Sequence, residues 1–141
     1  NDMTWPELVF ATCATFSTPE LPAQMLAVAE KYEVEPTLVL AVVWKESRCD
    51  PKALGSSNDS GLMQVIPKWH GDRMTKLGTT DLFDPVQNMT LGVDLLVGLG
   101  AKSDLRKALA TYNGGPRRPA QSWAYADSVI EIKQSLEEDG C

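Results

Sequence analysis

Histidine and cysteine are scarce in this sequence, which limits the metal chemistry it can support. Its 141 residues include one histidine, His70, and three cysteines, Cys13, Cys49 and Cys141, which form no C-x-x-C motif. A zinc site takes its ligands mainly from these two residue types, at characteristic spacings. The composition therefore predicts no metal site.

The odd number of cysteines leaves two interpretations open. One disulfide with one cysteine left over fits an oxidising compartment, and three free buried thiols fit the sequence equally well. The compartment therefore has to come from other evidence.

Long apolar runs and blocks of positive charge are also missing. No run approaches the roughly 18 apolar residues of a membrane span, so we expect none. The net charge is -6, and the pair Arg117-Arg118 alone does not supply the concentrated basic surface that phosphate binding needs. The sequence thus disfavours nucleic acid as a partner.

The chain shows no sign of division into parts. Its length corresponds to roughly one domain, and we find no repeat and no long linker, so we expect a single domain over residues 1–141 and a monomer. No basic and apolar signal peptide stands at the start, Asn1-Asp2-Met3. We expect a processed form, an engineered form, a fragment, or a protein delivered without such a signal.

Helix starts recur along the chain, each a small polar residue followed by proline or by an acid, between apolar stripes of helical period. These patterns predict helices over residues 8–16, 18–32, 37–48, 85–99, 105–112 and, after Ser122, to about 137. Residues 55–61 are rich in glycine, serine, asparagine and aspartate, which favours turns and a short hairpin. The fold class is therefore α+β, predominantly α-helical, with a small β-hairpin.

Glu46 is the strongest candidate for acid–base chemistry. At about 100° per residue, its side chain lies between those of Val39 and Val42 and next to Leu38, on an aliphatic side of the helix. Partial desolvation there would raise the pKa of the carboxyl group, as a general acid working near neutral pH requires. The alternative is a solvated glutamate in the last helical turn, as most helical glutamates are.

Two later blocks contain further polar candidates. Gly61-Leu62-Met63-Gln64 ends in an amide that can both donate to and accept from a sugar, although taken alone it favours a core strand or a helix start. Tyr112 continues an apolar helical stripe that is typical of a core tyrosine, but residues 113–116 end the helix and let its phenol point into a cleft. Tyr125 is in line with Val129, so core packing is an alternative for it as well.

In this order and spacing, Glu46-Ser47, Gly61-Leu62-Met63-Gln64 and Ala110-Thr111-Tyr112-Asn113-Gly114-Gly115-Pro116 resemble the catalytic domain of soluble lytic transglycosylases and their goose-type lysozyme relatives. The likeness runs from about residue 34 to 129, and the 18-residue step from Glu46 to Gln64 matches the spacing in the soluble enzymes. The resemblance implies a lysozyme-like fold and cleavage of the β-1,4 bond between N-acetylmuramic acid and N-acetylglucosamine in peptidoglycan, without metal or cofactor.

The resemblance also implies residue roles. Glu46 would protonate the leaving oxygen and then take a proton from the 6-hydroxyl of the sugar, which closes a 1,6-anhydro ring. Tyr112 would lie beside this acid. Substrate contacts would come from Ser47, Ser56, Met63, Gln64, Tyr112, Asn113 and Tyr125.

Asp59 departs from this pattern, because many soluble transglycosylases have a small residue there, whereas goose-type lysozymes and some wall enzymes of secretion machines carry an acid. A second carboxylate roughly 6.5–9.5 Å from Glu46 could hold a water and favour hydrolysis. The alternative is that Asp59 only stabilises a turn. Gly55 also departs, because related enzymes often have serine there, and Ser56 would then make that contact.

We therefore expect a peptidoglycan lytic transglycosylase. The alternatives are a hydrolytic muramidase that uses Asp59 and, from a different class, a non-catalytic wall-binding or assembly module. The partners would be peptidoglycan glycan strands and, depending on origin, a secretion, conjugation or phage assembly. We expect a periplasmic or extracellular location that faces the cell wall.

Overall fold

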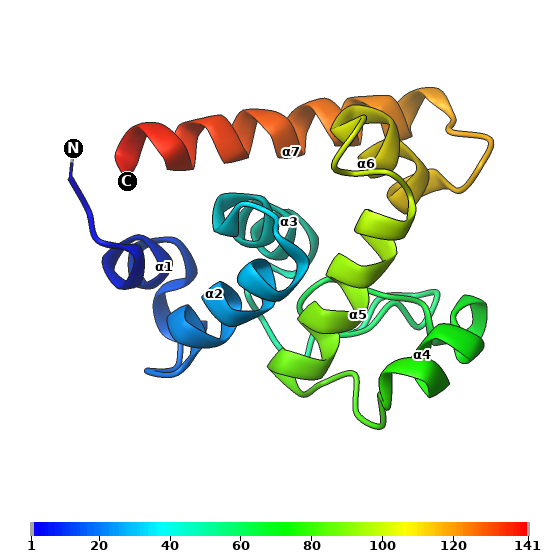
Figure 1. Ribbon diagram of the computed structural model, residues 1–141, viewed down its shortest axis with the longest axis horizontal. Coiled ribbons are helices and arrows are strands. Elements are labelled where there is room, and N and C mark those ends of the chain that lie inside the picture. Colours follow the sequence, from blue (N-terminus) through cyan, green and yellow to red (C-terminus); the bar gives the residue numbers. More distant parts are fainter. Residues whose placement is uncertain (1, 141) are drawn as a thin grey trace.

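The computed structural model describes residues 2–140, which form helices joined by turns (Figure 1). The α-helices are α1 (Trp5–Cys13), α2 (Leu21–Tyr32), α3 (Pro36–Ser47), α4 (Gly71–Leu77), α5 (Pro85–Gly98), α6 (Leu105–Gly114) and α7 (Ala120–Asp139), and two short 3₁₀ helices are η1 (Ala14–Phe16) and η2 (Pro67–Trp69). Within residues 2–140, no helix combines the length and apolar character that crossing a bilayer requires. The predominantly helical prediction is confirmed.

Several helix starts follow the predicted polar caps. The Thr4 side chain accepts a hydrogen bond from the backbone of Glu7, whose carboxylate accepts one from the Thr4 backbone in return. The carboxylates of Asp84 and Asp104 accept from backbone N–H groups in the first turns of α5 and α6. These side chains satisfy donors that a helix leaves unpaired at its start. The predicted starts of α5 and α6 agree with the structure, whereas α1 begins at Trp5, before the predicted residue 8.

Other boundaries differ from the prediction. The stretch 8–16 divides at Ala14, whose positive φ of 50° ends α1 and which is also the first residue of η1. The last helix begins at Ala120 and so includes Ser122, a buried residue of its first turn. Helix α4 was not predicted, because no side chain caps its start at Gly71.

The predicted β-hairpin is not found, because no residue from 2 to 140 belongs to a strand. Residues 55–65 instead form turns with two isolated antiparallel bridges, Leu54–Ser60 and Ser60–Val65. Asn88 of α5 supports this loop: its amide nitrogen donates to the Ser60 carbonyl (2.8 Å), and its oxygen accepts from the Met63 N–H (2.7 Å). A helix side chain thus satisfies backbone groups that a neighbouring strand would otherwise pair with.

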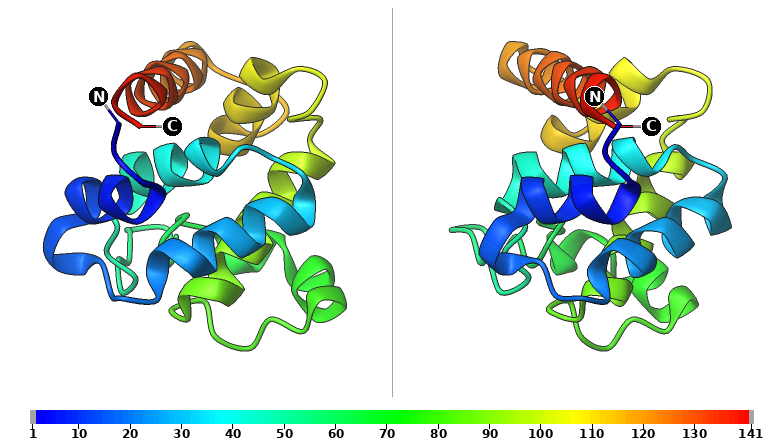
Figure 2. Two further views of the ribbon diagram at one scale, coloured as in Figure 1. Left: turned by 60° about the vertical axis from the view of Figure 1, so that its left-hand side comes forward. Right: turned by 90° about the vertical axis from the view of Figure 1, so that its left-hand side faces the viewer.

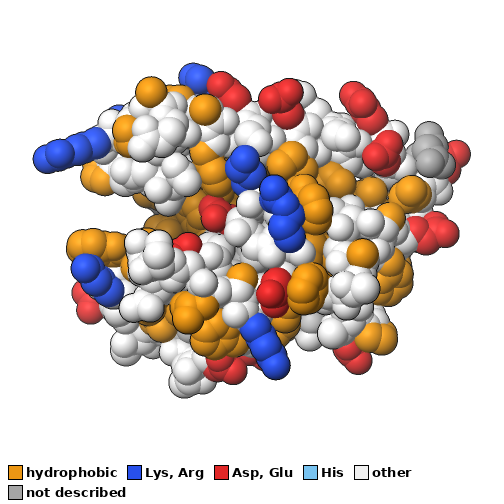
Figure 3. All heavy atoms as spheres, turned by 180° about the vertical axis from the view of Figure 1, so that it is seen from behind, with side chains coloured by type: hydrophobic (Ala, Val, Ile, Leu, Met, Phe, Trp, Pro, Cys, Tyr) orange, Lys and Arg blue, Asp and Glu red, His pale blue; other side chains and the backbone are white. Residues whose placement is uncertain are grey.

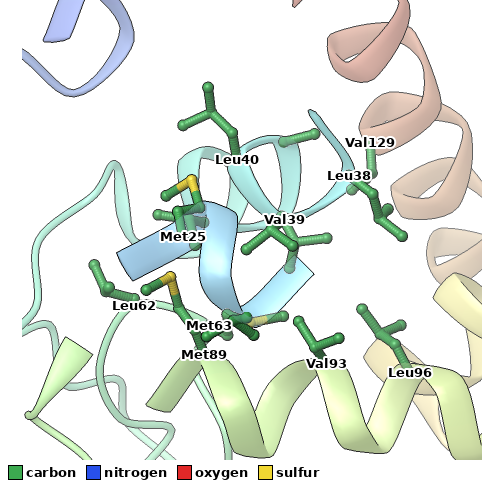
Figure 4. Packing of buried hydrophobic residues seen from close by; sticks show 14 of the residues in the cluster. Met25, Leu38, Val39, Leu40, Leu62, Met63, Met89, Val93, Leu96 and Val129 are labelled. Carbon is green, nitrogen blue, oxygen red and sulfur yellow. The ribbon is translucent and has the colours of Figure 1, made fainter. Parts of the chain in front are cut away.

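Helix α3 lies in the interior, with α7 along one side and α1 and α2 along others (Figures 1 and 2). Figure 4 shows Met25, Val39 and Met89, from α2, α3 and α5, in one core with Met63 of the loop. A Cβ atom on Gly92 would lie 2.5 Å from the Met63 sulfur, so this glycine makes room for the loop to pack on α5. The core therefore packs the loop against the helices through Met63.

A disulfide joins Cys13, the last residue of α1, to Cys49, two residues after the end of α3. Of the two interpretations of the cysteines, the structure therefore has the disulfide for Cys13 and Cys49. Cys141 lies outside the described residues. Closing a chain segment of this size typically stabilises a fold by about 3–4 kcal/mol. The cross-link holds the chain just after Glu46.

Candidate active site

A cleft of ≈ 770 Å³ opens where the loop after α3 faces the end of α6. Figure 3 shows this face of the molecule hollowed, with acidic side chains inside the hollow. The acidic residues of the lining are Glu46 and Asp59. The other lining residues are Ser56, Ser57, Gln64, Val65, Ile66, Trp69, His70, Leu95, Leu99, Thr111, Tyr112, Asn113, Gly114, Gly115 and Pro116.

Glu46 stands in the last turn of α3 and is partly buried, next to the fully buried Val39 and Val42. This environment penalises the charged form, and burial raises the pKa of Glu46 to about 7. The negative charge of Asp59 raises the pKa further, whereas a hydrogen bond from Tyr125 lowers it. Glu46 can therefore exchange a proton near neutral pH.

Tyr125 of α7 holds the Glu46 side chain. Its hydroxyl donates to Glu46 Oε2 over 2.5 Å, and its ring is 8% exposed. Burial and the charge of Glu46 raise the pKa of Tyr125 well above its usual range, so it remains a donor at neutral pH. Tyr125 is not among the residues that line the cleft, so it reaches the site through Glu46.

Tyr112 joins the two walls of the cleft. It lines the cleft from α6, and its hydroxyl donates to the Met63 carbonyl over 2.6 Å. Burial raises the pKa of Tyr112 well above its usual range, which keeps the phenol protonated. The tyrosine thus fixes the distance between α6 and the loop.

The two amides expected at the substrate both line the cleft and both bind other parts of the chain. Gln64 donates to the carbonyls of Ala53 (3.0 Å) and Gly61 (2.9 Å). Asn113 accepts from the Ser122 hydroxyl over 2.8 Å. Ser56 lines the cleft as well and is exposed.

Ser47 and Met63, which were also expected to contact substrate, do not line the cleft. The Ser47 hydroxyl is buried and bonds the carbonyls of Val43 (3.0 Å) and Leu62 (2.8 Å). Met63 is fully buried in the core. The structure therefore places both where they hold the end of α3 and the loop together.

Asp59 faces the cleft and also stabilises its own turn. Its Oδ1 accepts from the Ser57 N–H over 3.2 Å. A Cβ atom on Gly55 would lie 2.1 Å from Asp59 Oδ2, so the carboxylate occupies the place of a side chain at position 55. Glycine at position 55 and aspartate at position 59, the two departures from the family pattern, are thus linked, because the Asp59 carboxylate fills the space that a side chain at position 55 would need.

The sequence did not predict the other residues that form the wall of the cleft. Ile66, Trp69 and His70 come from the turn after the loop, and Leu95 and Leu99 from the end of α5. Trp69 is the residue that composition could have flagged, because aromatic side chains often line ligand clefts, but no local pattern showed where it lies. Among residues 2–140, no three side chains of His, Cys, Asp or Glu come together as a metal site would need.

The sequence is similar to those of known proteins. The family model described as Transglycosylase SLT domain matches residues 24–134. The "Transglycosylase" of Enterobacteria phage PRD1 is 36% identical over 109 residues, which cover 74% of this chain and 40% of that protein. A "Putative soluble lytic murein transglycosylase" of Haemophilus influenzae is 31% identical, with 77% of this chain and 19% of that protein covered.

Two solved structures share the fold at 18% identity and a TM-score of 0.73: the lytic transglycosylase Slt of Pseudomonas aeruginosa, as an inactive mutant, and the 70 kDa soluble lytic transglycosylase SLT70 of Escherichia coli. The match covers 83% of this chain and 24% of each of those chains. The matched residues thus cover 40% or less of each of these curated relatives and solved structures. Since the family model covers most of its residues, the chain belongs to the transglycosylase SLT domain family.

Proposed function

We propose that this chain is the catalytic domain of a lytic transglycosylase that cleaves the bond between N-acetylmuramic acid and N-acetylglucosamine in peptidoglycan and leaves a 1,6-anhydro end. One observation carries the proposal: a carboxyl group at the cleft, Glu46, whose pKa burial raises to about 7. Relatives named as murein transglycosylases support the substrate class. Peptidoglycan strands are then the partner, and the site of action is periplasmic or extracellular.

In the first step, protonated Glu46 gives its proton to the glycosidic oxygen as the bond to the anomeric carbon breaks. The carbonyl oxygen of the substrate's own N-acetyl group assists at that carbon. Tyr125 holds the carboxyl group in one orientation through its 2.5 Å hydrogen bond.

In the second step, the Glu46 carboxylate takes the proton from the 6-hydroxyl of the same sugar. The oxygen then attacks the anomeric carbon, closes the anhydro ring and restores the acetamido group. Glu46 ends protonated, as it began. A pKa near 7 suits both halves of this cycle.

The walls of the cleft supply the substrate contacts in this proposal. Ser56, Gln64, Tyr112 and Asn113 line it and would face the sugar, whereas Ser47, Met63 and Tyr125 would act by holding the loop and the acid in place.

Hydrolysis is the second candidate reaction, because Asp59 lines the same cleft and its charge raises the pKa of Glu46. Asp59 would then hold a water for attack on the face opposite the leaving group. The intramolecular reaction has the advantage that its nucleophile is already tethered, which gives it a large effective concentration over free water.

Replacement of Glu46 by glutamine tests the proposal. The amide keeps the shape but cannot transfer the proton, so we expect cleavage of isolated peptidoglycan to fall by about 10²–10⁴-fold or more. Glu30→Gln, at an exposed position on α2, is the matched control and should cleave as the parent does. Near-parental cleavage by a folded Glu46→Gln variant would exclude Glu46 from the mechanism.

A further inference from the structure

Trp69 is a large aromatic residue left in contact with solvent at the edge of the cleft. Its exposed fraction is 67%. Single exposed apolar residues are common on protein surfaces, so this exposure alone does not indicate a binding site. Its position is more informative than its exposure. Trp69 and His70 line both the cleft and a second hollow of ≈ 460 Å³, which residues 68–73 form. The two hollows therefore meet at Trp69.

Local hydrogen bonds fix the backbone that carries the Trp69 indole, and Lys68 lies close to the ring. Pro67 opens the 3₁₀ turn η2, and the backbone N–H groups of Trp69 and His70 donate to the carbonyls of Ile66 (3.2 Å) and Pro67 (3.1 Å). The Lys68 ammonium lies 4.7 Å from the ring centroid, a cation–π distance. Because the backbone of this turn is already ordered, less conformational entropy is lost there when a ligand stacks on the ring.

The second hollow is polar, and its lining includes Lys68, His70, Asp72 and Arg73 as well as Trp69. A flat apolar surface flanked by hydrogen-bonding groups complements a pyranose, whose C–H face is apolar and whose rim carries hydroxyls. The cleft and the second hollow therefore offer complementary surfaces to successive sugars of one strand.

We propose that Trp69 is a sugar-binding platform on which a glycan strand continues out of the cleft into the second hollow, beyond the sugars at Glu46. This inference rests on the proposed function, since it takes the occupant of the cleft to be a glycan. Because of Trp69, the protein would bind long glycan strands more tightly than short ones.

Binding to the Glu46→Gln protein tests this platform without cleavage of the ligand. Calorimetric titration uses a disaccharide and an octasaccharide of alternating N-acetylglucosamine and N-acetylmuramic acid. We expect Trp69→Ala in this background to weaken octasaccharide binding roughly three- to tenfold, the contribution of one aromatic contact, and to leave disaccharide binding unchanged. Trp69→Phe should restore most of the octasaccharide affinity.

Phe16→Ala is the matched control, because Phe16 is also exposed (45%) but lies in η1, outside both hollows. It should bind both ligands as the parent does. The proposal would be overturned if Trp69→Ala bound the octasaccharide as tightly as the parent does. It would also be overturned if Trp69→Ala lost affinity equally for the octasaccharide and the disaccharide. If the parent binds neither ligand, the proposed function itself fails.

Discussion

The Tyr125 hydroxyl and the Glu46 carboxylate are joined by a 2.5 Å hydrogen bond that links α7 to the end of α3 across 79 residues of sequence. This bond lowers the pKa of Glu46 against the larger effect of burial, which raises it. Tyr125, which does not line the cleft, therefore orients the acid and lowers its proton affinity, while burial keeps that affinity high.

Tyr125→Phe should raise the pKa of Glu46, because it removes the only hydroxyl bond to the carboxylate that the described residues provide. The alkaline limb of the pH profile of kcat should move to higher pH, and kcat should fall as the carboxyl group loses its fixed orientation. Tyr32→Phe is the control, since Tyr32 of α2 likewise donates to an acid, Asp94 of α5 (2.9 Å), and neither residue lines the cleft. An unmoved alkaline limb in Tyr125→Phe would contradict this role.

Glu46 should make the folded protein less stable at neutral pH than at acidic pH. Its pKa is raised from 4.5 to about 7 in the folded state, so the folded protein binds a proton that the unfolded chain has already released between these values. The favourable contribution is present in full below pH 4.5 and is lost as pH rises through about 7. The loss is at most about 3 kcal/mol.

Glu46→Gln should remove this dependence. Urea unfolding at several pH values should show the variant gaining stability relative to the parent as pH rises from 4.5 to above 7, while cleavage is lost. A constant difference in unfolding free energy over this range would mean that the carboxyl group is not desolvated in the folded state.

Gly55→Ala should displace the Asp59 carboxylate, because a Cβ atom at position 55 would lie 2.1 Å from Asp59 Oδ2. Displacing or neutralising this charge should lower the pKa of Glu46, so Gly55→Ala and Asp59→Asn should both move the alkaline limb of kcat to lower pH. The double variant should move it little further, because both changes remove the same interaction. Additive shifts would show that the two positions act independently.

Tyr112→Phe should reduce turnover more than stability. It deletes one hydrogen bond to the Met63 carbonyl, worth about 1 kcal/mol of unfolding free energy, and keeps the ring packed. Because this bond spaces the two walls of the cleft, we expect kcat to fall by more than about tenfold, which is 1.4 kcal/mol in the barrier. Unchanged kcat with a lower melting temperature would assign Tyr112 to the core alone.

The sequence predicted the features that local chemistry decides. Thr4, Asp84 and Asp104 cap helices because their side chains reach backbone groups three residues away, a relationship visible in the sequence. The environment of Glu46 followed from helical periodicity in the same way. These contacts depend on one helix and its immediate flank.

The features that were missed depend on contacts between distant segments. Asn88 pairs with backbone groups around Ser60, and residues 54–65 form isolated bridges in place of the predicted hairpin. Tyr125 meets Glu46, and Trp69 enters the cleft wall, only when the chain is folded. The family resemblance implied that Ser47 contacts substrate, but its hydroxyl is buried and bonds two carbonyls.

The proposed reaction closes a 1,6-anhydro ring on N-acetylmuramic acid. Mass analysis of the products from purified peptidoglycan tests this ring closure most directly. Anhydro and reducing ends of N-acetylmuramic acid differ by one water. We expect anhydro ends from the parent protein and also from Asp59→Asn, because Glu46 and the substrate's own groups suffice for the intramolecular reaction. Products dominated by reducing ends in the parent, and lost in Asp59→Asn, would contradict the account and show a hydrolytic muramidase.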